Sequence, residues 1–168
     1  MIYLKEANVD DTETEYEFLK DTPTNENGFE NKYYGLSYED FINQALPQII
    51  EVSKGIDLPN GYVPETFYFL WDDNNIVGLF KIRHYLTDYL RNGAGHIGYG
   101  IHKNYHGKGY ANKGLGLAIE KAKDVIKENE IYLSVHIDNP ASLKVQLNNK
   151  AYIHHFDEKE NYTRIKIW

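Results

Sequence analysis

The 168-residue sequence contains no cysteine. This absence excludes thiolate nucleophiles, zinc–thiolate sites, iron–sulfur clusters and disulfide bonds together. No apolar run approaches the roughly 18 residues that a membrane-spanning helix needs, and the first residues are followed by acids rather than by an apolar segment. We therefore expect no export signal, no membrane partner and a location in the reducing cytoplasm.

Basic residues are also few, since 18 Lys and Arg stand against 25 Asp and Glu and give a net charge of −7. Binding to a nucleic-acid backbone depends on many cations that release counterions from phosphates, so we expect no nucleic-acid partner. With 42% apolar residues the chain can bury one core. We expect a single domain over residues 1–168.

The spacing of apolar residues predicts an α/β fold with a mixed sheet. Alternating or β-rich runs predict strands at residues 2–5, 66–71, 76–85, 96–101, 131–137, 152–156 and 162–167. Capping residues and helical spacing predict helices at residues 10–21, 37–55, 111–126 and 140–149. Residues 10–12 should cap the first of these helices. Pro47 should kink the second helix, and Gly55 should end it. A polar loop is expected at residues 22–35. The order β-α-α-β-β-β-α-β-α-β-β predicts a central, mostly antiparallel sheet of about seven strands with helices on both faces.

One stretch reverses the acidic balance of the chain. There is no Asp or Glu between Tyr89 and Ile119. Inside it, a predicted strand ends near Ile101 and a glycine-containing loop leads into the predicted helix. The free N–H groups of such a helix start attract anions, and Gly107 and Gly109 would let a phosphate reach the backbone. The sequence therefore predicts a site for a negatively charged small molecule.

Two common phosphate-binding motifs do not fit this loop. A Walker loop needs Ser or Thr after Gly-Lys, yet Gly109 follows Lys108. The dinucleotide fingerprint needs a third glycine where Asn112 stands. We therefore expect neither a P-loop nucleotidase nor a dinucleotide-binding enzyme.

Residues 106–111 read His-Gly-Lys-Gly-Tyr-Ala. They resemble the pyrophosphate loop of the GNAT superfamily of acyl-CoA-dependent N-acyltransferases, Arg/Gln-x-x-Gly-x-Gly/Ala, with His in the first place. The order of elements also resembles that of the family, which implies a GNAT-like fold and acetyl-CoA (coenzyme A) as cosubstrate. The resemblance implies that the loop binds the CoA pyrophosphate and that the preceding strand end pairs with pantetheine. The residues so implied are Ile101, His102, His106, Gly107, Lys108, Gly109, Tyr110 and Ala111.

A second segment is similar to the family downstream. Asn139 and Ser142 match the Asn-x-x-Ser/Ala start of the helix after the fifth strand, which implies contacts with the pantetheine or phosphate arm. Gln146 departs from the pattern, because a tyrosine that protonates the leaving thiolate is common there. Residues 58–64, 83–86 and 95–99 also resemble a bacterial group of predicted acetyltransferases.

The resemblance implies direct attack of an amine on the thioester, with the oxyanion held by a backbone N–H of the fourth strand. A base near the amine is then needed. His96 is the first candidate, because its strand leads into the CoA loop and histidine titrates near neutrality. His136 on the adjacent predicted strand is the second, and Tyr99 could protonate the leaving thiolate. The alternatives are a hydrogen-bonded structural histidine and a packed strand tyrosine.

The acceptor groove of the family lies at the end of the third strand. Arg83 and His84 stand there, and an arginine would suit a substrate carboxylate, with a strand-end salt bridge as the alternative. The acids of the loops at 22–35 and 57–65 would instead attract a cationic amine, such as a polyamine, an aminoglycoside-like amine or a lysine. The acceptor is thus a small-molecule or peptide amine of open identity.

Three further expectations complete the interpretation. We expect no metal, because His154 and His155 are neighbours in a strand and should point to opposite faces. The terminal hairpin, with an exposed Trp168, would be consistent with a homodimer, and a monomer is equally allowed. Gln146 keeps open a catalytically silent acyl-CoA-binding sensor or interaction domain, and a scaffold without cofactor is a third alternative.

Overall fold

The central sheet is antiparallel, with strand order β1-β4-β5-β6. Its strands are β1 at Ile2–Glu6, β4 at Glu65–Asp72, β5 at Asn75–Arg83 and β6 at Ile97–Ile101. The structure is a computed structural model that describes residues 1–167, so the predicted exposure of Trp168 lies outside the described residues. The strands of this sheet match four of the predicted strands.

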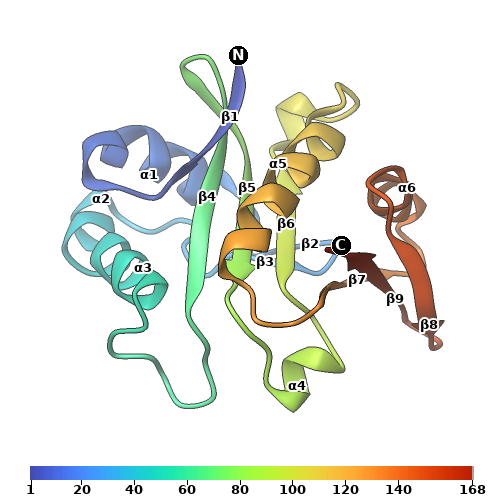
Figure 1. The fold of residues 1–168 in the computed structure, drawn as a ribbon. Coiled ribbons are helices and arrows are strands. Elements are labelled where there is room, and N and C mark those ends of the chain that lie inside the picture. The colour runs from blue at the N-terminus through green and yellow to red at the C-terminus, as the bar shows by residue number, and fades with distance from the viewer. Residues whose placement is uncertain (168) are drawn as a thin grey trace.

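Strand β4 shows why the sheet is covered on both faces. Its residues alternate between two cores, with Phe67, Phe69 and Trp71 in one and Tyr68 and Leu70 in the other. Such an alternation follows from the two-residue period of a strand. The first core is closed by helices α1 (Thr12–Asp21) and α3 (Leu46–Ser53), and the second by α5 (Tyr110–Val125). Figure 1 shows α1 and α3 on one side of β4 and β5 and α5 on the other, so the predicted helices on both faces are confirmed.

A second sheet holds the remaining long strands in the order β7-β9-β8. They are β7 at Glu130–His136, β8 at Tyr152–Phe156 and β9 at Glu160–Lys166, and helix α6 (Pro140–Asn148) connects β7 to β8. The prediction of about seven antiparallel strands is confirmed, but they form sheets of four and three. Between β6 and β7 there is a single bridge, Gly95 with Leu133, so the two sheets separate beyond it.

The bridge between the sheets requires a glycine. Gly95 has φ +70°, and a Cβ built there would lie 2.2 Å from the carbonyl oxygen of Tyr132. Next to it, the N–H of His96 donates to the same carbonyl at 2.7 Å. Only a residue without a side chain lets the two backbones approach this closely.

The second predicted helix is more complex than its sequence pattern. It runs as α2 (Tyr38–Asp40), a π-helical turn (Phe41–Ala45) and α3. Ser37 caps it as predicted, because its hydroxyl accepts from the N–H of Asp40 at 3.2 Å. Pro47 lies in the first turn of α3, directly after the π-helical turn. Gly55 ends the helix in a Schellman arrangement, in which Ile56 N donates to Glu51 O at 3.0 Å.

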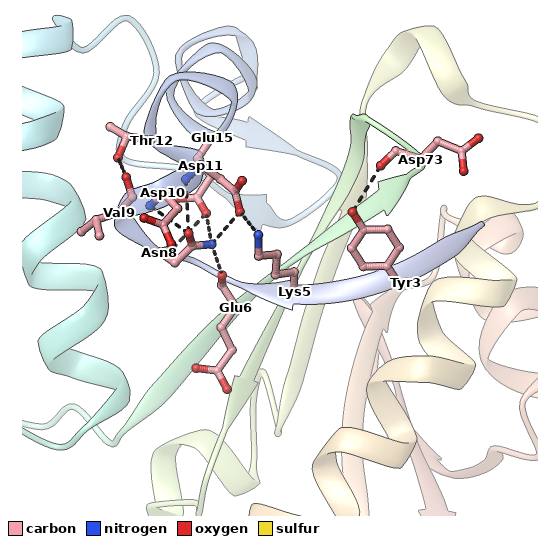
Figure 2. Close-up of polar contacts among 10 residues, drawn as sticks. All are labelled: Tyr3, Lys5, Glu6, Asn8, Val9, Asp10, Asp11, Thr12, Glu15 and Asp73. Carbon is pink, nitrogen blue, oxygen red and sulfur yellow. Dashed lines mark hydrogen bonds and ion pairs between the residues drawn. The ribbon is translucent and has the colours of Figure 1, made fainter.

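The cap predicted for the first helix is corrected. Residues 10–12 do not cap it, because the side chain of Asn8 accepts from the N–H groups of Asp10 and Asp11 at 3.0 and 3.2 Å (Figure 2). These bonds start a short 3-10 turn, Val9–Asp11, which continues into α1. The N–H of Asn8 in turn donates to Oε1 of the buried Glu15 at 3.0 Å.

The expected loop at residues 22–35 contains a small ribbon. Strands β2 (Asn25–Glu26) and β3 (Phe29–Glu30) pair across Asn27 and Gly28, which have φ +53° and +89°. An Asn-Gly pair with two positive φ values is typical of a tight hairpin turn. A short helix, α4 (Asp88–Arg91), was also not predicted, and Thr87 caps it. No helix among residues 1–167 is both long and apolar enough to cross a membrane.

Candidate functional site

The glycine loop between β6 and α5 leaves its backbone open. A 3-10 turn, Lys103–Tyr105, follows β6, and α5 starts at Tyr110. Gly107 and Gly109 have φ +74° and +82°, and a Cβ at either position would meet no atom within 4 Å. No side chain caps α5 and no acid lies in its first turn. The unpaired N–H groups at this helix start and the positive end of its dipole therefore face open space, which suits an anion.

A cavity of about 1020 Å³ extends from this loop along the gap between β6 and β7. It reaches from Gly107 and Gly109 past Tyr99 and Ser142 to Lys81 under the β2–β3 ribbon. Typical small-molecule sites measure about 300–1,000 Å³. The cavity is thus at the upper end of that range and suits a long ligand together with a second molecule.

His106, which replaces Arg or Gln of the family loop, turns back onto its own strand. Its Nε2 donates to the carbonyl oxygen of Ile101 at 2.7 Å and lies 3.8 Å from a carboxylate oxygen of Glu26 in the ribbon. The N–H of His102 donates to Val77 at 2.9 Å. The carbonyl of Ile101 and the N–H of His102 thus have partners within the chain, and the cofactor role of the two residues stays a prediction.

Two other loop residues have side chains whose polar ends contact other residues of the protein. The hydroxyl of Tyr110 donates to Asp72 at 2.6 Å, and the ammonium of Lys108 lies 5.5 Å from the ring centre of Tyr105. Tyr110 and Ala111 line the cavity, whereas Lys108 does not. These side chains help to position the loop, and its two glycines, Gly107 and Gly109, line the cavity.

Helix α6 brings a polar cluster to the opposite wall. The side chain of Asn139 accepts from the N–H of Ser142 at 3.2 Å, and the Ser142 hydroxyl lies 2.8 Å from that of Tyr99. The Tyr99 ring stacks on Phe80 at 5.3 Å between ring centres, and burial raises its pKa. Gln146 is occupied elsewhere, because its Oε1 accepts from Thr163 at 2.7 Å. Tyr99 therefore brings a phenolic hydroxyl to this cavity wall, beside the hydroxyl of Ser142.

His96 lies outside the cavity and joins the two sheets. The side chain is fully buried, and both ring nitrogens have partners. Nδ1 accepts from the N–H of Tyr132 at 2.9 Å, which leaves Nε2 to donate to Glu128 at 2.9 Å. Burial lowers the pKa of His96, and the carboxylate of Glu128 opposes that effect. No ring nitrogen remains free for a substrate proton, so this geometry favours the structural alternative, while the base assignment itself stays a prediction.

His136 is placed differently, in the cavity wall at the end of β7. Its Nδ1 contacts the carboxylate of Glu160. The turn of the ribbon covers its other nitrogen, since a Cβ at Gly28 would lie 2.4 Å from Nε2. His136 is thus an imidazole with a carboxylate partner that faces the cavity.

The two predicted acceptor residues have separate surroundings. Arg83 lines the cavity, but its Nε lies 3.2 Å from Glu65 and its Nη1 donates to the carbonyl of Gly95 at 3.0 Å. His84 does not line the cavity, and its ring contacts the Thr66 hydroxyl at 2.7 Å. Burial lowers the pKa of His84. The geometry matches the strand-end salt bridge that was the alternative for Arg83.

The prediction that His154 and His155 point to opposite faces is wrong. The pairing of β8 with β9 shifts between Ile153 and His155, which is the mark of a β-bulge. The bulge turns both imidazoles to one side, where their Nδ1 atoms lie 2.8 Å apart. Within residues 1–167 no group of three or more His, Cys, Asp or Glu side chains could hold a metal ion.

The sequence interpretation missed Lys81 and the ribbon. Lys81 lines the cavity next to Arg83, and its ammonium donates to the carbonyl of Glu30 at 2.6 Å. The period of strand β5 places it on the same face as Leu79. The Asn27–Gly28 pair was the available signal for the ribbon.

Comparisons with known proteins agree on the fold. The sequence model of the acetyltransferase (GNAT) family matches residues 26–146. No curated protein matches the chain. One similar solved structure is RimL, a ribosomal L7/L12 alpha-N-protein acetyltransferase in complex with coenzyme A, with a TM-score of 0.70 and 15% identity over 99% of this chain and 94% of that one. A second is the N-acetyltransferase PseH of Campylobacter jejuni in complex with acetyl coenzyme A, with a TM-score of 0.61 and 18% identity over 99% of each chain. A third contains mutant forms of the spermidine/spermine N-acetyltransferase SpeG of Vibrio cholerae, with a TM-score of 0.63 and 15% identity over 99% of this chain and 95% of that one. At these identities the likeness is one of fold.

Proposed function

The chain belongs to the acetyltransferase (GNAT) family, and on this basis we propose that it moves an acetyl or other short acyl group from acetyl-CoA to a primary amine. The acceptor is a small molecule or a peptide, and one domain over residues 1–168 carries the activity. The observation that carries the proposal is the open backbone at Gly107 and Gly109, at the start of α5 on a cavity wall.

The loop fits the pyrophosphate of CoA by its amides rather than by its side chains. The amides at residues 107–111 would hold the two phosphates, with Gly107 and Gly109 giving access to the backbone. Lys108 and Lys113 add positive charge nearby, and the first turn of α5 has no acid to oppose an anion. Asn139 and Ser142 would contact the pantetheine arm from the opposite wall.

The reaction needs two proton transfers. The acceptor nitrogen attacks the thioester carbonyl carbon and the carbon–sulfur bond breaks, so one proton leaves nitrogen and one reaches the thiolate. We propose Tyr99 as the donor to the thiolate, because its hydroxyl lies on the cavity wall beside Ser142. Burial raises its pKa, which keeps the phenol protonated at neutral pH.

The geometry supports His136 over His96 as the base that accepts the proton from the amine. His136 lines the cavity, and the carboxylate of Glu160 contacts its Nδ1 and can orient the ring. His96 does not line the cavity, and both of its ring nitrogens have partners within the fold. The pH–rate profile separates the two, since replacing the base by glutamine should remove the acidic limb of the profile. Replacing a structural histidine should leave the limb in place.

The activity test uses a matched pair of glycine variants. The enzyme is incubated with acetyl-CoA and a panel of amines, and free thiol and acetylated product are measured. Gly109→Asp places a carboxylate at the proposed pyrophosphate site, and Gly35→Asp places one at another open glycine with φ +70° outside the cavity. Transfer by the wild type and by Gly35→Asp, with loss in Gly109→Asp, supports the proposal. CoA binding without transfer to any amine would instead indicate the silent acyl-CoA-binding domain.

A further inference from the structure

Lys81 has an unusual position for a lysine. It lies in the middle of β5, opposite Phe67 of β4 and Gly98 of β6. It is partly buried in the cavity wall, and its ammonium lies 4.8 and 5.1 Å from the ring centres of Phe29 and Phe67. Gly98 has no side chain, so nothing on β6 separates this ammonium from the gap between β6 and β7. Lys81 is therefore a cation at the acceptor end of the cavity.

The ammonium of Lys81 has no carboxylate partner in the part of the chain that the structure describes. Within residues 1–167 no carboxylate oxygen lies within 4.0 Å of it, and its hydrogen bond goes to the main-chain carbonyl of Glu30. An ammonium has three N–H donors. Burial lowers the pKa of Lys81, as expected for a charge removed from water without an opposite charge. At least one N–H donor is left for another partner.

Lys32 adds a second cation to the same cavity. It also has no carboxylate within 4.0 Å among the described residues, and its ammonium lies 3.5 Å from the side-chain oxygen of Gln48. After burial, the positive charges of Arg83 and, to a smaller extent, of Lys32 also lower the pKa of Lys81. Glu65 and Glu30 oppose this effect, but Glu65 is held by Arg83 at 3.2 Å.

We propose that Lys81 and Lys32 form an anion subsite for the acceptor, so that the preferred acceptor is an amine that also carries a carboxylate or a phosphate. The proposal rests on the proposed N-acyltransferase function and assigns its substrate class. An anionic group would take the unused donors of Lys81, and Lys32 lines the same cavity. The buried rings of Tyr33 and Phe67 supply an apolar wall beside it. A polyamine would be repelled by the same pair.

A structural role for Lys81 makes a different prediction. If the ammonium only held the β2–β3 ribbon through the carbonyl of Glu30, its loss would impair all acceptors alike. If it binds the acceptor anion, its loss would impair the anionic acceptors selectively. Matched pairs of amines with and without the acidic group distinguish these two roles.

The experiment compares phenylalanine with phenethylamine, and O-phosphoethanolamine with ethanolamine, with spermidine as a polycationic acceptor. The ratio of kcat/KM within each pair is measured for the wild type, Lys81→Met, Lys81→Arg and Lys32→Met. Lys159→Met, at an exposed position of the β8–β9 turn that does not line the cavity, controls for net charge. The wild type should prefer the anionic member of at least one pair by about 10- to 100-fold, as expected for a charge-assisted hydrogen bond.

The preference should vanish in Lys81→Met, fall in Lys32→Met, and remain in part in Lys81→Arg. A preference for phenylalanine over phenethylamine identifies the acidic group as a carboxylate, and a preference for O-phosphoethanolamine over ethanolamine identifies it as a phosphate. Equal losses for both members of each pair in Lys81→Met would overturn the proposal, as would a wild-type preference for spermidine.

A binding measurement tests the anion subsite independently of catalytic turnover. Calorimetric titration of the same compounds into the enzyme–CoA complex reports acceptor binding without an acyl group. Tighter binding of the anionic member, lost in Lys81→Met, supports the subsite even in an inactive protein. No difference within either pair overturns it, whereas failure of CoA to bind the wild type would count against the proposed function itself.

Discussion

The buried carboxyl group of Glu15 makes a quantitative prediction about stability and pH. Glu15 lies on α1 with 0% exposure. Its Oε1 accepts from the N–H of Asn8 at 3.0 Å and from the Asn8 side chain at 3.4 Å (Figure 2), whereas Oε2 is buried without a hydrogen-bond partner among residues 1–167. Burial is the main cause that raises the pKa of Glu15 from 4.5 to about 8. The folded protein therefore holds a proton on Glu15 at neutral pH.

The sign and size of the effect follow from proton linkage. Because the folded pKa is above the unfolded one, the contribution is fully present below pH 4.5 and is lost as the pH rises through about 8. One pKa unit corresponds to about 1.4 kcal/mol. Glu15 should therefore lower the free energy of unfolding by about 4 kcal/mol between pH 5 and 9, and by about 1 kcal/mol between pH 7 and 9.

Glu15→Gln removes the titration while keeping the acceptor oxygen for Asn8. Urea unfolding at pH 5, 7 and 9 measures the free energy of unfolding for the wild type, Glu15→Gln and Glu13→Gln, which changes an exposed glutamate of the same helix. The wild type and Glu13→Gln should lose stability toward pH 9, and Glu15→Gln should lose much less. A pH dependence in Glu15→Gln as steep as that of the wild type would refute the reasoning.

Three further predictions concern packing and chemistry. Gly114→Ala should cost about 1–3 kcal/mol in urea unfolding, because its Cβ would lie 2.4 Å from the ring of Phe80. Tyr99→Phe should slow acetyl transfer at least about tenfold while acetyl-CoA binding, measured by calorimetry, stays within about threefold of the wild type. Equal losses of binding and rate would contradict its role as proton donor. His96→Ala should lower the melting temperature and leave the shape of the pH–rate profile unchanged, whereas a lost acidic limb would restore His96 as the base.

The strands of the fold could be predicted because a β-rich run is a local signal in the sequence. In β4 the residues at 67–71 form a continuous apolar run, which is typical of a strand buried on both faces, and in the structure they alternate between two cores. The separation of the sheets could not be predicted in the same way. It depends on the close approach of Gly95 to Tyr132, 37 residues further along the chain, which no local pattern records.

The glycine loop of the candidate site could be predicted from the sequence, but most of the side-chain contacts around the site could not. Gly107 and Gly109 have the positive φ values and the open surroundings expected of a phosphate loop. His96 stood on a promising strand, but its partner Glu128 comes from a segment beyond α5. Lys81 was missed because its environment is built by the distant ribbon at residues 25–30.

The central claim, an acyl-CoA site at the start of α5, is tested most directly by a thermal-shift titration. The melting temperatures of the wild type, Gly109→Asp and Gly35→Asp are measured with acetyl-CoA, CoA and ATP. A ligand at 100 times its Kd should stabilise the protein by about 2.7 kcal/mol, which corresponds to about 5–10 °C for a domain of this size. The account predicts such shifts with both CoA species but not with ATP, retained in Gly35→Asp and lost in Gly109→Asp. No shift of the wild type with acetyl-CoA or CoA would contradict it.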